Sequence, residues 1–241
     1  VKETSWPSKT KVPASEEESP KRTPTDIQAA LDVVPKIIEV ASATEKQNNL
    51  NEVQVDFSRS YLKFAWLNHR NLEKAYLWHT DLSKAYLEKA ELLEADLWGA
   101  KLIKANLRKA VLHKAKMGKV DLTGADLRET DLTNANLRYA LLTDANLKGA
   151  ILTGAVLLKT DLSGCINLER EQISGLKRAF LCGTILPDHL NDIDPNRDLE
   201  NPEFLKAFKS TTGSLKRKEE DENMSKTREY IRELLMKSEQ S

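Results

Sequence analysis

Four histidines and two cysteines are the side chains of this chain that most readily bind metal ions or act as nucleophiles. They are His69, His79, His113, His189, Cys165 and Cys182. Zinc motifs place paired ligands about two to five residues apart, and no two of these six residues are that close. We therefore predict no metal or other cofactor, and we expect both cysteines to be small core thiols rather than a disulfide framework.

Carboxylates are plentiful, but their spacing does not indicate acid–base catalysis. Between residues 57 and 162, six aspartates each directly precede a leucine: Asp81, Asp96, Asp121, Asp126, Asp131 and Asp161. At a turn, an Asp or Asn side chain can accept a hydrogen bond from the backbone two residues further on, and we interpret these aspartates in that way. No glycine-rich phosphate loop follows a strand. The sequence predicts that the protein is not an enzyme.

Positive charge is concentrated in one stretch, although the whole chain is balanced with 37 basic and 37 acidic residues. No acidic residue lies between Leu97 and Val120. The cations of this stretch, here called the basic belt, are Lys101, Lys104, Arg108, Lys109, Lys114, Lys116 and Lys119. Two interpretations stay open: a site for a polyanion, an anionic membrane surface or an acidic protein, or a solvated surface without a partner.

Two pairs of aromatic residues are separated by twenty positions, Trp78 with Trp98 and Trp66 with Tyr86. None of the four coincides with the regular apolar positions described below. They are therefore expected to point outward, where either flanking segments cover them or they anchor a protein partner, a role that Trp and Tyr often have.

These side chains are positioned by a pattern with a period of five. From Phe57 to Leu162, every fifth residue is large and apolar, and twenty of these twenty-two positions are Leu. The residue two positions earlier is Ala in fifteen repeats. This period fits neither an α-helix nor a single strand, which repeat every 3.6 and 2.0 residues. It predicts a coil in which four five-residue sides make one turn and residues twenty apart stack.

The repeat reads as A-[D/N]-L-x-x, with clear copies at Ala125-Asp126-Leu127, Ala135-Asn136-Leu137 and Ala145-Asn146-Leu147. It resembles the pentapeptide-repeat family of bacteria, especially cyanobacteria. The resemblance implies an all-β solenoid, a right-handed quadrilateral β-helix of about 22 five-residue repeats with short helical caps and a C-terminal helix. In such a coil the basic belt encircles the rod and His69 and His79 lie on opposite faces. The inward position of Arg70 predicts that its side chain either distorts the first turn or reaches out of it.

The flanking sequence suggests five segments. They are a disordered tail (1–24), a helix and entry segment (25–54), the β-helix (55–167), a C-terminal cap (168–190) with a helix from Arg170 to Leu181, and a polar extension (191–241) with an amphipathic helix from Met224 to Met236. The last helix would dock either on its own solenoid or on a partner. No apolar run is long enough to span a membrane.

We therefore expect a non-catalytic scaffold that binds another protein, placed in the cytoplasm, with tethering to a membrane by a segment upstream of Val1 as a variant of this hypothesis. Binding of an anionic surface or of nucleic acid by the basic belt is an alternative, and nucleic acid is disfavoured because no recognition motif is present. Some relatives protect topoisomerases by mimicking DNA, which requires an acidic surface. Residues 56–164 contain thirteen acidic and seventeen basic residues, a net charge of +4, so we rank DNA mimicry last.

Overall fold

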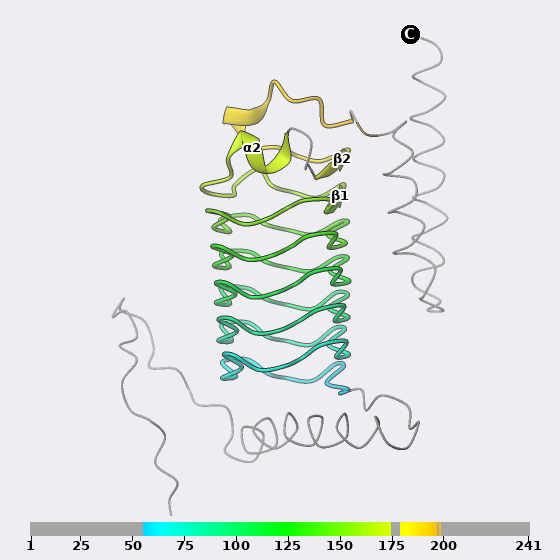
Figure 1. The fold of residues 1–241 in the computed structure, drawn as a ribbon, viewed down its shortest axis with the longest axis vertical. Helices are drawn as coiled ribbons and strands as arrows, with labels where there is room; N and C mark the ends of the chain where they lie inside the picture. Colours follow the sequence, from blue (N-terminus) through cyan, green and yellow to red (C-terminus); the bar gives the residue numbers. More distant parts are fainter. Residues whose placement is uncertain (1–54, 175–178, 197, 199–241) are drawn as a thin grey trace, which may run out of the picture.

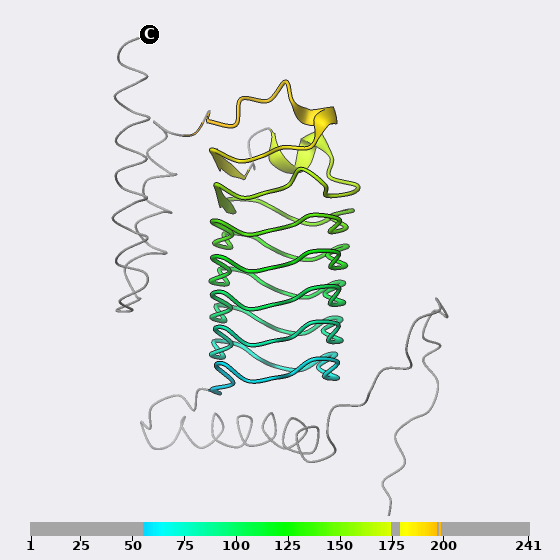
Figure 2. The same cartoon turned by 180° about the vertical axis from the view of Figure 1, so that it is seen from behind.

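The computed structural model describes residues 55–174, 179–196 and 198, which form a rod of stacked coils (Figures 1 and 2). Parallel single-residue bridges join positions twenty apart, as in the series Asp81, Lys101, Asp121, Leu141 and Asp161. A bridge recurs at every fifth residue, so each turn of the coil has four sides. The predicted four-sided solenoid is confirmed.

Regular strands are short and few in the described part of the chain. They are β1 (Val156–Leu158) and β2 (Phe180–Cys182), which pair in parallel with Val156 opposite Phe180. Elsewhere two of the five residues of each side form a turn at the corner, which leaves too few extended residues for a longer strand.

Backbone hydrogen bonds connect each side to both neighbouring coils. In the repeat 111–115, the N–H of Leu112 donates to Asp131 O (2.7 Å) and the N–H of Lys114 donates to Thr133 O (2.9 Å) in the next coil. The N–H of Val111 donates to Ala90 O (2.9 Å) in the preceding coil. The ladder is therefore continuous along the rod although most of its members are single residues.

Each corner from Arg59 to Lys159 contains a residue with positive φ, two positions after the inward apolar residue. Lys114 (φ 56°) and Arg59 (φ 58°) are examples, and Gly99 (φ 64°) occupies the same place in its repeat. Left-handed backbone is unfavourable for non-glycine residues. Because the N–H groups of these residues bond to the next coil, as for Lys114, the ladder offsets the local strain.

The core is a column of stacked leucines flanked by alanines. Leu107 and Ala105 are buried, and Met117 fills a leucine position without exposure. This confirms which residues point inward. Three inward positions hold threonine instead of alanine, at 80, 130 and 160, and each buried hydroxyl donates to a carbonyl oxygen 23 residues earlier in the sequence. A polar residue is tolerated there because its hydroxyl is hydrogen-bonded.

Arg70 also occupies an inward position, but it does not distort the coil. Its N–H donates to Leu67 O at 3.2 Å, a turn bond of the same kind as in neighbouring repeats, and the residue is half-buried. Of the two predicted outcomes, distortion of the first turn is not observed.

The C-terminal end of the stack is closed by α2 (Arg170–Ile173) and a 3-10 helix (Asp188–Leu190) (Figure 1). The Gln172 amide of α2 donates to Leu147 O and Ala150 O, both at 2.8 Å, and so satisfies carbonyl groups of the last coil. Ile173 is fully buried.

The predicted helix from Arg170 to Leu181 is wrong in its extent. The helix ends at Ile173, and Phe180–Cys182 instead form β2, which continues the stack on β1. The step between paired residues here is 24 instead of twenty, as from Val156 to Phe180. The apolar, strand-favouring residues 180–182 are stabilised by this parallel pairing, which a helix would lose.

Several predictions fall outside the described residues. These are the tail 1–24, the segment 25–54 and most of the extension 191–241, including the helix from Met224 to Met236. Within the described residues, no helix is long and apolar enough to cross a membrane.

Candidate interaction surfaces

The histidines and cysteines are dispersed over the structure. His69 and His79 lie two sides apart on the coil, as expected, and no group of metal-binding side chains is found in the part of the chain that the structure describes. A ring nitrogen of His189 lies 2.8 Å from Leu168 O, a contact within the end of the rod. This arrangement gives His189 a structural partner.

Both cysteines are buried thiols, as predicted. Desolvation by burial raises the pKa of Cys165 to about 11 and that of Cys182 to about 12. Since the thiolate is the nucleophilic form, these two groups are protonated and weakly reactive at neutral pH.

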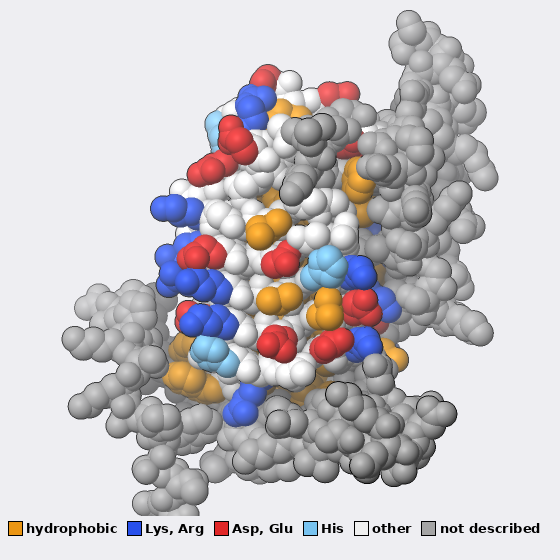
Figure 3. All heavy atoms as spheres, viewed as in Figure 1, with side chains coloured by type: hydrophobic (Ala, Val, Ile, Leu, Met, Phe, Trp, Pro, Cys, Tyr) orange, Lys and Arg blue, Asp and Glu red, His pale blue; other side chains and the backbone are white. Residues whose placement is uncertain are grey.

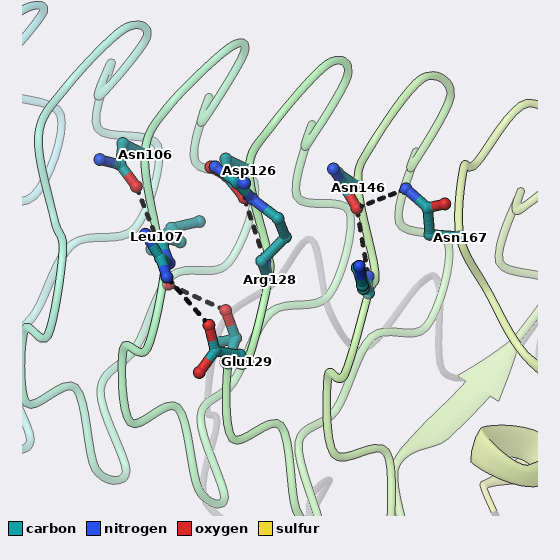
Figure 4. Close-up of polar contacts among 10 residues, drawn as sticks. Asn106, Leu107, Asp126, Arg128, Glu129, Asn146 and Asn167 are labelled. Atoms are coloured by element: carbon teal, nitrogen blue, oxygen red, sulfur yellow. Dashed lines mark hydrogen bonds and ion pairs between the residues drawn. The ribbon is translucent and has the colours of Figure 1, made fainter. Parts of the chain in front are cut away.

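The aspartates that precede leucines bind their own turns, which confirms the interpretation from sequence. Asp126 Oδ1 accepts from the N–H of Arg128 at 3.2 Å, and Asp131 Oδ1 accepts from the N–H of Thr133 at 2.9 Å. The four other aspartates of this set make the same bond. In Figure 4, Asn106, Asp126 and Asn146 stand in one column and repeat this geometry from coil to coil. The Asp or Asn of the repeat thus satisfies a backbone N–H that the ladder leaves free.

One of these carboxylates also forms an ion pair. Nε of Arg128 donates to Asp126 Oδ1 at 2.8 Å. Burial would raise the pKa of Asp126, but the hydrogen bonds and charge of Arg128 outweigh it and the pKa is lowered. Asp126 is therefore an ionised structural group on the rod surface.

The basic belt is distributed over all four sides of the coil. Lys116 and Lys119 lie on one side, Lys101 and Lys104 on the next, Arg108 and Lys109 on the third, and Lys114 on the fourth. A flat partner can therefore contact only part of the belt at once.

Adjacent coils bring acidic residues next to the belt, a relationship that reading along the sequence misses. Glu129 lies 3.1 Å from Arg108 and 3.4 Å from Lys109, and Glu94 lies 3.6 Å from Lys114. The hydrogen bond from Arg108 lowers the pKa of Glu129. Figure 3 shows Lys and Arg gathered along one edge with Asp and Glu among them. The gap of twenty positions between stacked residues is the signal that predicts these pairs.

Trp66 and Tyr86 form an outward aromatic pair, as predicted. Their rings stack with centroids 4.4 Å apart and an interplanar angle of 19°, and both residues are half-buried. Nearby in the chain, Tyr61 is 63% exposed. Trp78 is also half-buried, with the guanidinium of Arg59 at 4.4 Å from its ring centroid.

Trp98 lies at an outward position, but unlike the other three aromatic residues it is almost completely covered. It is only 3% exposed. Its ring occupies the space beside Gly118 in the next coil, and the Arg138 guanidinium lies 4.9 Å from the ring centroid. Trp98 is thus part of the packed structure and is not a free anchor for a partner.

Comparison with known proteins agrees with this architecture. The sequence model described as "Pentapeptide repeats" matches in eight copies over residues 56–92, 71–108, 90–128 and 130–166. HetL, a pentapeptide repeat protein involved in heterocyst differentiation regulation in the cyanobacterium Nostoc sp. strain PCC 7120, is 31% identical. That alignment covers 58% of this chain and 81% of HetL, with a TM-score of 0.24.

Two further solved structures are similar to this chain. A pentapeptide repeat protein from the Arabidopsis thaliana thylakoid lumen is 26% identical, covering 52% of this chain and 79% of that protein, with a TM-score of 0.26. QnrB1, a plasmid-mediated fluoroquinolone resistance protein, is 16% identical, covering 56% and 78%, with a TM-score of 0.40. No curated protein matches the chain significantly.

The repeat matches and the identity to HetL define the class of this protein. The chain belongs to the pentapeptide-repeat family, whose fold is a right-handed quadrilateral β-helix. Members of the family are generally non-catalytic structural or interaction proteins.

Proposed function

We propose that this protein is a non-catalytic scaffold that binds a protein partner through the outer surface of its rod. The scaffold comprises twenty-two repeats from Phe57 to Leu162 with a short helical cap at its C-terminal end. At a strand spacing of about 4.8 Å, five and a half coils give a rod roughly 26 Å long. Its leucine column holds the surface side chains at fixed positions.

The observation that carries this proposal is the Trp66–Tyr86 stack. The two rings point away from the leucine column, so the core does not need them. Pre-stacked aromatic rings lose little conformational freedom on binding, and Trp and Tyr are enriched among residues that dominate binding energy. Exposed Tyr61 lies in the first coil at the same end of the rod, on the neighbouring side of the coil.

The test is a comparison of binding by three purified full-length chains. Proteins that co-purify with the wild type are identified, expressed and titrated against the wild type, against Trp66→Ala with Tyr86→Ala, and against the control Leu141→Ala with Ile151→Ala. The control also removes two exposed large side chains. Loss of about 2 kcal/mol, roughly thirty-fold in Kd, is expected only for the aromatic variant. Equal affinity for all three chains would contradict the aromatic-anchor proposal.

A second candidate function is binding of an anionic membrane surface by the basic belt. The observation that favours it is that Lys101 and Lys104 are exposed and form no ion pair with any described residue. This candidate is compatible with a cytoplasmic protein tethered at a membrane. The ion pairs of Arg108, Lys109 and Lys114 weaken it, because those charges are partly neutralised.

Vesicles containing phosphatidylserine test the second candidate. Changing Lys101, Lys104 and Lys116 to Glu should abolish binding, and changing Arg59, Lys148 and Lys159 to Glu should not. Binding should also fade as salt rises from 0.1 M to 1 M, where the Debye length falls from about 10 Å to about 3 Å. Absence of wild-type binding to these vesicles would eliminate this candidate. Topoisomerase protection by DNA mimicry is the weakest alternative, because the coils carry a net charge of +4.

A further inference from the structure

One corner of the rod carries a lysine in each of three successive coils. The turns at 63–64, 83–84 and 103–104 stack there, between the bridge series that begins at Tyr61 and the series that begins at Trp66. The lysines and the aromatic residue of these turns, here called the lysine corner, are Lys63, Phe64, Lys84 and Lys104. The lysine corner therefore borders the side of the rod that carries the aromatic stack.

The ring of Phe64 holds two of the three ammonium groups. Nζ of Lys63 lies 5.2 Å from the centroid of this ring, and Nζ of Lys84 in the next coil lies 5.5 Å from it. The face of an aromatic ring attracts a cation at such distances. Because these two long side chains are already held in place, they lose less conformational freedom when an anion binds them.

The lysine corner lacks the carboxylate that neutralises a lysine at the next corner along the chain. There, Lys109 lies 3.4 Å from Glu129 of the adjacent coil. In contrast, neither Lys84 nor Lys104 forms an ion pair with any residue that the structure describes. The first acidic residue in the turns of the lysine corner is Asp144, two coils beyond Lys104. The positive charge of this corner is therefore not balanced by its own stack.

Cations in neighbouring coils of the lysine corner repel each other. The coils are about 4.8 Å apart, and like charges that face each other on neighbouring strands destabilise a sheet. A Cβ on Gly124, in the coil after Lys104, would lie 3.2 Å from Cγ of Lys104. The stem of Lys104 thus uses the space over this glycine, and the residue is exposed. An external anion that contacts Lys84 and Lys104 together would offset their repulsion.

Aromatic surface lies on both sides of these cations. Tyr61, in the same coil as Lys63, is 63% exposed. Phe64 and Tyr86 are half-buried, and the Tyr86 ring stacks on Trp66 with 4.4 Å between the centroids. A complementary partner surface has carboxylates beside an aromatic or aliphatic side chain.

Two carboxylates beside the lysine corner favour a protein segment over a membrane or a nucleic acid. Asp81 follows Tyr61 in its bridge series, and Glu88 lies in the turn after Tyr86. Both would repel a surface that is negatively charged throughout, whereas a peptide carries carboxylates only at particular positions. A corner of the rod is also convex, and single-stranded nucleic acid is typically bound in a positively charged groove.

We propose that the lysine corner binds a short acidic segment of the protein partner. The three lysines span two coil spacings, about 10 Å, a distance that about three residues of an extended chain cover. Carboxylates at alternate positions of this segment pair with Lys84 and Lys104, and a neighbouring aromatic or aliphatic side chain packs on Tyr61. The inference rests on the proposed scaffold function, because it names the chemistry of the partner that the aromatic stack anchors.

Fluorescence anisotropy of a labelled peptide, Gly-Phe-Ser-Glu-Ser-Glu-Ser-Gly, tests this inference with full-length chains. The corner variant is Lys84→Glu with Lys104→Glu. The control variant, Lys74→Glu with Lys114→Glu, changes the same turn position at the opposite corner, and Glu129 shows that this backbone accepts glutamate. The corner variant should bind the peptide at least about ten-fold more weakly than the wild type, and the control should not. A peptide with Lys in place of both Glu residues should prefer the corner variant, because its charge is reversed.

Three outcomes would overturn the inference: no binding of the acidic peptide to the wild type, equal affinity of the wild type and the corner variant, or tighter wild-type binding of oligothymidylate or phosphatidylserine vesicles than of the peptide. Far-UV circular dichroism verifies that each variant retains the solenoid. If the corner variant does not fold, Lys84→Gln with Lys104→Gln removes the same charges with a milder change.

Titration of the co-purified protein partner separates this inference from the aromatic-anchor proposal. If the partner loses affinity for Trp66→Ala with Tyr86→Ala but not for the corner variant, the aromatic anchor stands and the lysine corner is wrong. If it loses affinity only for the corner variant, the lysine corner stands and the aromatic anchor is wrong.

Discussion

The ring of Trp98 occupies the place that a side chain at position 118 would need in the adjacent coil. A Cβ built on Gly118 would lie 1.9 Å from Cζ3 of Trp98. Gly118 thereby leaves room for the indole ring and for the guanidinium of Arg138, 4.9 Å from the ring centroid. One small residue thus allows two large ones to pack in the same column.

Gly118→Ala is therefore expected to destabilise the protein by about 1–3 kcal/mol, because the added methyl group displaces a packed ring. Thermal unfolding of the wild type, the single variants Gly118→Ala and Trp98→Ala, and the double variant measures this coupling. In the double variant the clash is absent, so the double variant should lose less stability than the sum of the losses in the two single variants. Additive losses of stability would show that the contact between position 118 and Trp98 does not cause the destabilisation.

Leu107→Ala should reduce the free energy of unfolding by about 2–5 kcal/mol, because it leaves a cavity in the leucine column. The neighbouring Arg108→Ala should cost at most about 1 kcal/mol, since it removes a surface ion pair with Glu129. Urea denaturation of both variants makes the comparison. Equal losses would mean that the inward and outward positions are assigned wrongly.

Insertion of one residue after Leu112 should prevent the C-terminal coils from stacking. It shifts every later leucine out of line with the leucine twenty positions earlier, so the ladder and the core are lost together. A five-residue insertion at the same place, Ser-Gly-Ala-Asp-Leu, is the control because it puts its alanine and leucine at the inward positions and keeps every later leucine in phase. Limited proteolysis should cleave the first variant much faster. Similar resistance of the two variants would contradict a core that depends on the five-residue phase.

Cys165 and Cys182 should react slowly with iodoacetamide in the folded protein at pH 8. Burial raises their pKa values to about 11 and about 12, so the reactive thiolate is a minor species at this pH. Unfolding in guanidinium chloride restores an ordinary thiol pKa and should increase the labelling rate sharply. Mass spectrometry over time measures both rates, and rapid labelling of the native protein would show that the cysteines are accessible.

The inward positions were predictable from sequence because a solenoid converts periodicity directly into burial. Leu107 and Ala105 are buried for the same reason as every other member of their series. The turn bonds of Asp126 and Asp131 were likewise predictable, since they link residues two apart. The C-terminal cap was less predictable from sequence. A local helical pattern suggested a helix as far as Leu181, but Phe180–Cys182 form a strand that pairs in parallel with β1.

The charge and burial of the surface side chains depend on contacts between residues that are not neighbours in the sequence. The sequence by itself determined the four-sided coil, because a period of five with leucine at one position is satisfied by a single inward column. Only the tertiary structure decided that Glu129 neutralises part of the basic belt and that Trp98 is buried beside Gly118. These contacts join residues about one coil apart, where packing and charge depend on the particular side chains that meet and not on the repeat.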